Sequence, residues 1–400
     1  MTSAAFRGWL CVAVASGPVL VACQNQATVG ARAGIAPSSL RRSSRALEVD
    51  PAVGPLDAAA GRGATQRGFT YEPLDPRGEP VEPIPSDVEL FFEDYLERDY
   101  RPALIELGRS LFHDPRLSTD NSLSCASCHD LRYGGVDRAV TATGYHGQIG
   151  VLNTPTVFNA VLHLSQFWDG RAPDLETQAD GPPQAPTEMA SSWKEILVKL
   201  DADALMTRQF RTAFPEVDFA AGIRAEHVQM AIAEFERTLI TPNAPFDQYL
   251  MGDPAAVSEE VKEGYQVFKD VGCIECHNGM AIGARSYQRL GRSKDYFVEE
   301  MAHGPLGRMD VTGEESDRFV FKVGSLRNVA LTGPYLHDGS VETLEQVIRL
   351  MGHYQLDIEL TGGQVRRIAA FLRSLTGEFG GQPLLRIQNT VAHPAPATPR

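Results

Sequence analysis

Apolar residues recur at intervals of three and four along several stretches of the chain, the spacing that places them on one face of a helix. The pattern predicts helices over residues 101–112, 191–200, 226–239, 257–268, 344–351 and 363–375. No stretch shows the sustained alternation of apolar and polar residues that is typical of a half-buried strand. The sequence therefore predicts a mainly α-helical fold.

Two segments lack this periodicity. Residues 23–86 are rich in Ala, Gly, Pro, Ser and Arg and predict a flexible linker. The Pro- and Ala-rich residues 381–400 predict a disordered tail. The length between them suits two domains, which we place at 87–243 and 244–380 because the helical pattern breaks off near 241–245 and then restarts.

The first 22 residues resemble an export signal. They carry one charged residue, Arg7, followed by an apolar run too short for a comfortable membrane span. The run ends in Leu-Val-Ala-Cys at 20–23, which resembles a bacterial lipobox, in which Cys23 would be acylated and become the mature N-terminus. An ordinary signal peptide cleaved nearby and an uncleaved anchor are the alternatives. All three export the protein, and the lipobox predicts a periplasmic protein held to a membrane by lipid.

The formal net charge of −14 changes the expected partners. An acidic surface argues against binding to nucleic acid and favours a basic partner, such as a small basic electron donor. The apolar fraction of 43% is ordinary for a globular protein.

Candidate chemistry lies in a pentapeptide that occurs twice, Cys-Ala-Ser-Cys-His at 125–129 and Cys-Ile-Glu-Cys-His at 273–277. Two thiols at this spacing can add to the vinyl groups of a haem, and the adjacent histidine then lies under the iron as its proximal ligand. A zinc half-site, a disulfide or a redox dithiol needs no histidine directly after the second cysteine. We therefore predict two covalently attached haem c groups. Their attachment and iron-binding residues are Cys125, Cys128, His129, Cys273, Cys276 and His277.

Further segments resemble signatures of bacterial diheme cytochrome c peroxidases, and they lie at 167–172, 188–189, 321–328 and 337–340. The resemblance extends over roughly residues 89–377. It implies two tandem cytochrome c-like domains, the first with a low-potential peroxidatic haem and the second with a high-potential electron-transfer haem. It also implies an enzyme that reduces hydrogen peroxide to water with electrons from a small cytochrome c or a cupredoxin. A homodimer is the usual state of the family.

In the second domain, the resemblance implies that Met351 is the distal ligand opposite His277. A thioether is a soft ligand that favours Fe(II), so a His/Met haem has a high reduction potential. His353 and Tyr354 are neighbours that could bind the iron instead, and relatives that modify a partner protein have tyrosine there. His337 matches a family position near this haem, where we expect a structural role.

In the first domain, the resemblance implies that His146 is the distal ligand opposite His129. His146 lies in the glycine-rich stretch 134–155, which predicts a loop whose movement could release the ligand. His163 is the alternative ligand. Once the distal ligand leaves, peroxide could bind in its place.

The same resemblance assigns three residues to the peroxide reaction. Glu188 would move a proton between the peroxide oxygens, first as general base and then as general acid. Gln178 would orient the peroxide. Trp168 would lie between the haems as an electron bridge, although an ordinary core tryptophan also explains it.

A calcium site between the domains is implied at Asn153, Thr332 and Pro334. Side-chain amide and backbone carbonyl oxygens are the hard ligands that Ca²⁺ takes.

Two other functions are compatible with the sequence. The first is a relative that uses peroxide to oxidise side chains of a partner protein. The second is a non-catalytic diheme electron carrier, in which both irons would be permanently six-coordinate.

Overall fold

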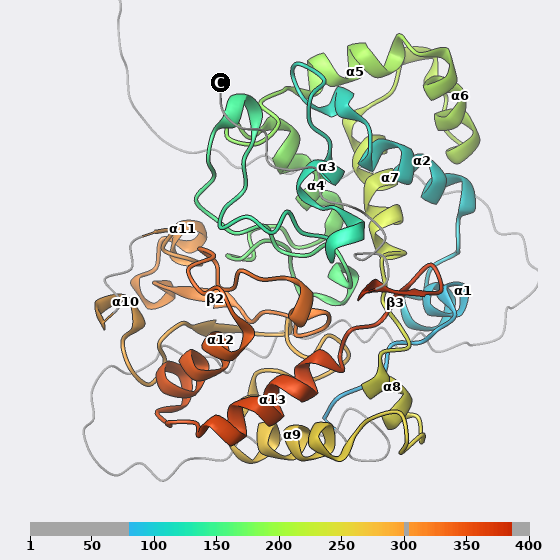
Figure 1. Ribbon diagram of the computed structural model, residues 1–400. Helices are drawn as coiled ribbons and strands as arrows, with labels where there is room; N and C mark the ends of the chain where they lie inside the picture. Colours follow the sequence, from blue (N-terminus) through green and yellow to red (C-terminus); the bar gives the residue numbers. More distant parts are fainter. Residues whose placement is uncertain (1–79, 300–303, 386–400) are drawn as a thin grey trace, which may run out of the picture. The chain divides into compact units, whose positions relative to one another are not determined.

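The structure is a computed structural model that describes residues 80–299 and 304–385 (Figure 1). This part of the chain is mainly helical, as predicted. Its strands form two short antiparallel pairs, β1 (Tyr287–Arg289) with β2 (Val320–Lys322) and β3 (Glu378–Phe379) with β4 (Gln382–Pro383). No described helix has both the length and the apolar character needed to cross a membrane. The predicted export signal and Cys23 lie outside the described residues.

We call residues 80–243 the first half and residues 244–385 the second half. The α-helices of the first half are α1 (Val88–Leu90), α2 (Pro102–Phe112), α3 (Cys125–Cys128), α4 (Leu175–Gln184), α5 (Trp193–Asp201), α6 (Ala204–Ala213) and α7 (Ala225–Arg237). Those of the second half are α8 (Pro245–Leu250), α9 (Glu259–Asp270), α10 (Tyr296–Glu299), α11 (Met309–Thr312), α12 (Leu344–Leu350) and α13 (Gly362–Arg373).

Each helix predicted from the periodicity is present within a few residues, but α4 and α6 were not predicted. In α4 only Leu175, Ala179 and Pro183 are buried, so its apolar face is a single narrow line. The helix also contains Gly181 and two prolines, which the sequence pattern reads as breakers. The Asp174 side chain caps its N-terminus by accepting a hydrogen bond from the backbone N–H of Thr177 at 2.7 Å.

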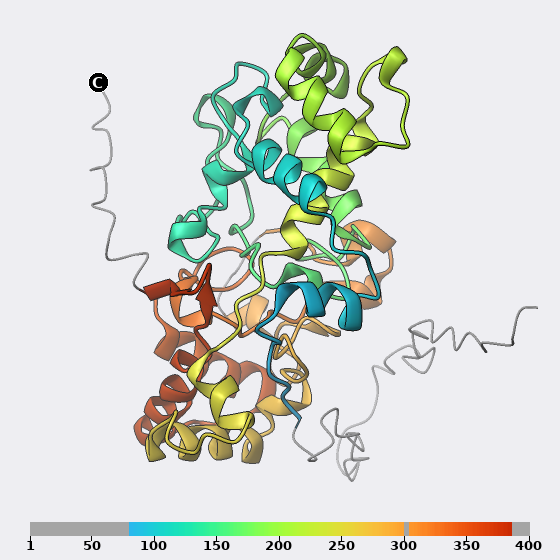
Figure 2. The same ribbon diagram turned by 90° about the vertical axis from the view of Figure 1, so that its right-hand side faces the viewer.

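The ordered chain extends further at both ends than predicted. Val81 and Ile84, placed in the linker, are 0% and 1% exposed, and Val81 forms a β-bridge with Gly279. Figure 2 shows this segment (blue) beside the second half before it reaches α2. At the other end, Leu384, placed in the tail, is fully buried. Single apolar residues in otherwise polar runs form these contacts, and they give no periodic signal.

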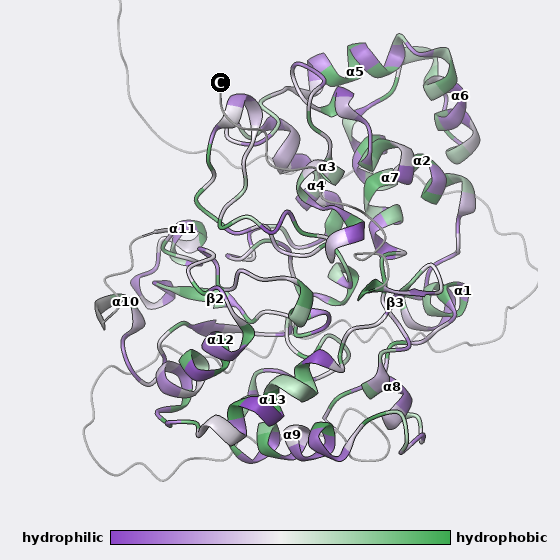
Figure 3. Ribbon diagram, viewed as in Figure 1, coloured by the Kyte–Doolittle hydropathy of each residue, from purple (hydrophilic) through white to green (hydrophobic). Residues whose placement is uncertain are grey.

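The buried apolar side chains form two large clusters, one within residues 104–239 and one within 246–375, each joined by a few residues from elsewhere. The first is built on the packing of α2 against α7, and the second on α9 against α13. Figure 3 shows hydrophobic and hydrophilic residues alternating around α9 and α13, so each presents one apolar side to the other.

Both helix pairs pack backbone to backbone at a glycine. A Cβ on Gly108 of α2 would lie 1.8 Å from the carbonyl oxygen of Ala231, and one on Gly264 of α9 would lie 1.9 Å from that of Arg367. No larger residue fits at either position without separating the helices. Each half thus has a close helix–helix contact at a glycine beside its cysteine motif.

The correspondence between the halves continues residue by residue at an offset of 169 positions. Asn159 and Asn328 both have positive φ, and each precedes one 3-10 turn. The Asn159 side-chain oxygen accepts the backbone N–H of Thr241 at 2.9 Å, and that of Asn328 accepts the N–H of Gly377 at 3.1 Å. Both side-chain amides donate to the Thr241 hydroxyl, which therefore joins the two repeats.

Each repeat also forms a backbone hydrogen bond to the other repeat. The backbone N–H of Asn153 donates to the carbonyl of His337, and the N–H of Lys322 donates to the carbonyl of Trp168, each at 2.8 Å. Asn153 corresponds to Lys322, and Trp168 corresponds to His337. Each half therefore binds the turn of the other through equivalent atoms.

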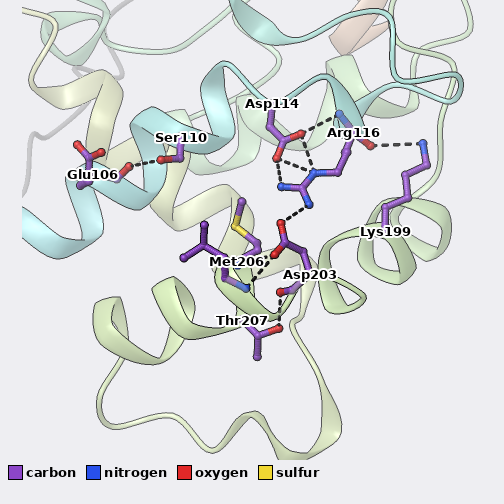
Figure 4. Close-up of polar contacts among 9 residues, drawn as sticks. Glu106, Ser110, Asp114, Arg116, Lys199, Asp203, Met206 and Thr207 are labelled. Atoms are coloured by element: carbon purple, nitrogen blue, oxygen red, sulfur yellow. Dashed lines mark hydrogen bonds and ion pairs between the residues drawn. The ribbon is translucent and has the colours of Figure 1, made fainter.

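Ion pairs hold the turn that leads into the first cysteine motif (Figure 4). The Arg116 guanidinium pairs with Asp114 at 2.5 Å and with Asp203 at 2.9 Å. The Lys199 ammonium donates to the carbonyl of Ser118 at 2.6 Å. Through these contacts α5 and α6 fix the chain just before the motif.

A buried ion pair and its hydrogen bonds join four segments of the chain. Arg327 and Asp247 have fully buried side chains, 2.6 Å apart. The same guanidinium donates to the carbonyls of Met280, at 2.8 Å, and Glu82, at 2.6 Å. Burial raises the pKa of Asp247, and the Arg327 charge opposes that shift.

Replacement of the arginine, Arg327→Met, should destabilise the protein by about 3–5 kcal/mol because it leaves the Asp247 carboxylate buried without its partner. Denaturant unfolding of the haem-loaded protein measures this. The double variant Arg327→Met/Asp247→Leu should recover part of the loss. A single variant as stable as the wild type would contradict the assignment.

Candidate functional site

The first Cys-x-x-Cys-His motif forms one turn of helix, α3. The backbone N–H of Ser124 donates to the hydroxyl of Ser127 at 2.9 Å and starts this turn. The N–H of His129 donates to the carbonyl of Cys125 at 2.9 Å and closes it. The second motif forms a similar turn, in which the N–H of His277 donates to the carbonyl of Cys273 at 3.0 Å. Each turn thus gathers two thiols and an imidazole within five residues.

Burial favours the neutral form of both motif histidines, which suits an iron ligand because a ligand imidazole must be neutral. Burial lowers the pKa of His129, and the carbonyl of Gly135, 3.2 Å from its Nδ1, acts in the opposite direction. Burial also lowers the pKa of His277 to about 4, against the opposing effect of the nearby carbonyls of Ile282 and Gly324. The Gly135 contact engages Nδ1 of His129 and leaves Nε2 for a metal.

Burial likewise favours the protonated, neutral form of the four motif thiols. Burial raises the pKa of Cys128 to about 11 and that of Cys273 to about 12, and it raises the pKa of Cys125 and Cys276 as well. A redox dithiol or a zinc site uses thiolates, whose pKa is lowered by the surroundings. Neutral thiols in an apolar setting fit haem attachment better than either alternative.

A largely apolar cavity opens beside the second motif. Its wall includes Cys273, Cys276, His277 and Met351. Met351 is the first residue of a π-helical turn, Met351–Gln355, which directly follows α12. The structure therefore brings the predicted second pair of axial ligands to one cavity.

The two alternatives to Met351 lie elsewhere. Tyr354 is 6% exposed and packs its ring against Tyr296, with the centroids 5.2 Å apart. His353 pairs with the Glu359 carboxylate. Neither Tyr354 nor His353 belongs to the cavity wall.

The first half closes one side of this second-half cavity, because Asn153, Phe167 and Trp168 also line it. The Trp168 indole N–H donates to the carbonyl of Asn153 at 2.9 Å. With the Lys322 contact described above, both the indole and the backbone of Trp168 are fixed. Trp168 is therefore a rigid part of the boundary between the halves.

The three predicted calcium residues, Asn153, Thr332 and Pro334, line the same cavity. The Asn153 amide donates to the carbonyls of Ala139, at 3.0 Å, and Val140, at 3.1 Å, so its oxygen remains an acceptor. Among the described residues no hydrogen bond reaches the carbonyl oxygen of Thr332 or of Pro334. These oxygens fit the hard, uncharged donor set that Ca²⁺ accepts.

His146 is exposed on the long first-half loop, with φ of 52°. Its ring stacks on that of Tyr145, with the centroids 3.9 Å apart. The backbone N–H of Tyr145 donates to the carbonyl of Glu188 at 2.7 Å. A Cβ on Gly144 would lie 2.0 Å from the carbonyl of Thr187, so the loop lies directly against the Glu188 segment.

Glu188 lies in a turn that folds back on α4, the helix that carries Gln178. The backbone N–H of Met189 donates to the carbonyl of Pro182, which fixes this turn. Glu188 is half-buried, and its charge acts to raise the pKa of the thiols of Cys125 and Cys128, so it lies near the first motif. Burial raises its own pKa, which suits a group that both takes and returns a proton.

Sequence reasoning missed a charged residue beside this carboxylate. Arg171 acts to lower the pKa of Glu188 and thereby opposes the effect of burial. The guanidinium is held by Asp169, at 2.9 Å, and lies over the Phe167 ring, 3.4 Å from its centroid. Phe167, Asp169 and Arg171 lie in the 167–172 segment quoted for the family resemblance, which was the available signal.

His163 does not support the alternative of a distal ligand in the first half. It lies in the wall of the second cavity, with Nδ1 3.2 Å from the Lys322 ammonium. Lys322 also donates to the carbonyl of Ser165 at 2.8 Å. No role of its own was predicted for this lysine from the sequence, and only the fold shows that it is enclosed.

Comparisons with known proteins agree with this geometry. A family model for di-haem cytochrome c peroxidase matches residues 102–255. The chain is 48% identical over 321 residues to cytochrome c peroxidase Ccp of Escherichia coli K12, a match covering 79% of this chain and 66% of that protein. It is 48% identical over 275 residues to cytochrome c551 peroxidase of Nitrosomonas europaea, covering 69% and 80%.

Among solved structures, a MauG-like protein associated with microbial copper homeostasis is similar, with a TM-score of 0.63 and 27% identity. The match covers 79% of this chain and 96% of that one. Duplicate haem-attachment motifs, the paired cores and these relatives agree, and the family implies two haem c groups. The chain therefore belongs to the di-haem cytochrome c peroxidase family and is an oxidoreductase.

Proposed function

We propose that this chain reduces hydrogen peroxide to water, with electrons from a small cytochrome c or a cupredoxin. The observation that carries the proposal is the position of Glu188, whose carbonyl accepts a hydrogen bond from the loop of His146 and whose carboxyl lies near the first motif with a pKa raised by burial. Bound haem supplies the iron chemistry and the storage of electrons. The roles below belong to side chains of this chain.

In the first half, Glu188 accepts a proton from the near oxygen of peroxide and returns it to the far oxygen, which leaves as water. Gln178 orients the peroxide, and His146 vacates the position that peroxide takes. The exposure of His146 and its place on a loop support such a movement. The overall balance is one peroxide, two electrons and two protons to two waters.

In the second half, His277 and Met351 hold the haem that receives electrons, and Trp168 provides the path to the first half. Met351 supports this role by lining the cavity together with His277. Ca²⁺ bound by Asn153, Thr332 and Pro334 stabilises the boundary through which the electrons pass.

Oxidation of a partner protein's side chains is the alternative function that the sequence leaves open. The position of Tyr354 outside the cavity wall favours the peroxidase. A simple electron carrier gives no reason for a half-buried carboxyl near the first motif, held against the loop of His146.

We also infer a two-domain protein, residues 87–243 and 244–380, exported to the periplasm and anchored through lipid on Cys23. The repeated helix pairs and their separate cores support the division. A homodimer completes the proposed assembly.

Substitution of the carboxyl, Glu188→Gln, should lower peroxide turnover by about 10²–10⁴-fold because the amide cannot move a proton. Steady-state oxidation of a reduced cytochrome c measures this, with the haem spectra unchanged. Glu226→Gln, at an exposed glutamate of α7, is the matched control. Unchanged turnover in Glu188→Gln would make the acid–base role wrong.

The positive charge of Arg171 should set the pH at which kcat/KM falls on the acid side of its pH profile, the acid limb. Glu188 must be ionised to take the first proton, so kcat/KM falls as pH drops through its pKa. Loss of the cation in Arg171→Gln raises that pKa further and should move the limb to higher pH. Arg318→Gln, which removes a surface partner of Glu315, should leave it in place. An unmoved limb in Arg171→Gln would argue against Glu188 as the titrating group.

A further inference from the structure

The residues of the calcium site have counterparts in the other repeat. At the offset of 169 positions, Asn153 corresponds to Lys322, and Thr332 and Pro334 correspond to His163 and Ser165. Contacts support this offset, because Asn153 and Lys322 make equivalent backbone hydrogen bonds to the opposite turn. The chain thus contains a second place built like the calcium site, with a lysine in place of the asparagine.

The Lys322 ammonium lies where this correspondence would put a cation. Its Nζ donates to the carbonyl of Ser165 at 2.8 Å and lies 3.2 Å from Nδ1 of His163. Ser165 is the counterpart of Pro334, whose carbonyl accepts no hydrogen bond from a described residue. One repeat therefore satisfies its carbonyl with an ammonium group, and the other leaves an oxygen for an external cation.

The residues around the Lys322 ammonium show that it is enclosed and that the segment it binds is hydrogen-bonded to β1. Burial lowers the pKa of Lys322 to about 7, and the Asp169 carboxylate, itself paired with Arg171, opposes that effect. The Nε2 of His163 is buried without a hydrogen-bond partner among the described residues. The Ser165 hydroxyl bonds that of Tyr287 at 2.6 Å, which ties the same segment to β1.

We propose that the Lys322 ammonium is the built-in counterpart of the calcium ion. It is a positioning residue that holds the 163–168 turn, with Trp168, against the second half, as Ca²⁺ holds the 332–337 turn against the first. This inference rests on the calcium site of the proposed function. Its consequence is that only one of the two turns responds to external calcium.

The residues at the two corresponding positions can be exchanged to test this. Lys322→Met removes the cation, and Lys322→Asn restores the donor that the other repeat carries. Asn153→Lys places an ammonium group in the calcium site. Each haem-loaded variant is compared with the wild type at about pH 6, where the lysine is protonated. The thermal midpoint and bound calcium are measured in chelator and in Ca²⁺.

In the wild type we expect Ca²⁺ to raise Tm. Lys322→Met should lower Tm by about 2–4 °C, the size expected for one lost interaction, and Ca²⁺ should not recover that loss. In chelator, the Tm of Lys322→Asn should fall by the same amount. In Ca²⁺ this variant should recover that Tm and bind one additional Ca²⁺ ion. Asn153→Lys should no longer respond to the chelator.

The outcomes separate the two claims. A wild type that binds no Ca²⁺ would contradict the calcium site, and with it the correspondence. A wild type that binds Ca²⁺, together with Lys322→Met of unchanged Tm, would overturn the inference alone. The inference would also be overturned if Ca²⁺ raised the Tm of Lys322→Asn no more than it raised the Tm of Lys322→Met.

Discussion

Two equivalent backbone hydrogen bonds, one from each repeat to the other, fix how the two halves of this structure pack together. In each repeat a backbone N–H, of Asn153 or of Lys322, binds the carbonyl of the opposite turn, at His337 or Trp168. Backbone atoms make these bonds, so they constrain position without constraining side chains. The halves are held in one register while their side chains remain free to differ.

The functional differences arise at these equivalent positions. Trp168, with its indole N–H bonded to the Asn153 carbonyl, stands where the other repeat has His337, whose ring stacks on Phe321. The proposed distal ligands differ in their support. Met351 follows α12 directly and packs against a buried cluster, whereas His146 is exposed on a loop. A side chain on a packed helical turn resists displacement, and one on a loop can be released. The proposed asymmetry of the two irons follows from this contrast.

Much of this fold could be predicted from the sequence because its signals are local. The amphipathic spacing located α2, α7, α9 and α13, and the pentapeptides gave the attachment cysteines. The tandem arrangement was predicted, but the correspondence at an offset of 169 positions was not, because it depends on a few separated residues such as Asn159 and Asn328 rather than on a continuous similarity. Neither the sequence nor the family resemblance indicated that Lys322 is enclosed, since that depends on contacts across about 160 positions. The distal and calcium ligands were predicted from the family resemblance alone. The structure shows which residues surround them, but their roles still rest on that resemblance.

We propose that one iron keeps both axial ligands while the other releases a histidine. Low-temperature electron paramagnetic resonance and near-infrared magnetic circular dichroism of the oxidised and half-reduced haem-loaded protein test it most directly. We expect histidine–methionine ligation in the second half in both states. In the first half we expect bis-histidine ligation that is lost on half-reduction. Two irons that remain six-coordinate in the half-reduced protein would contradict this proposal.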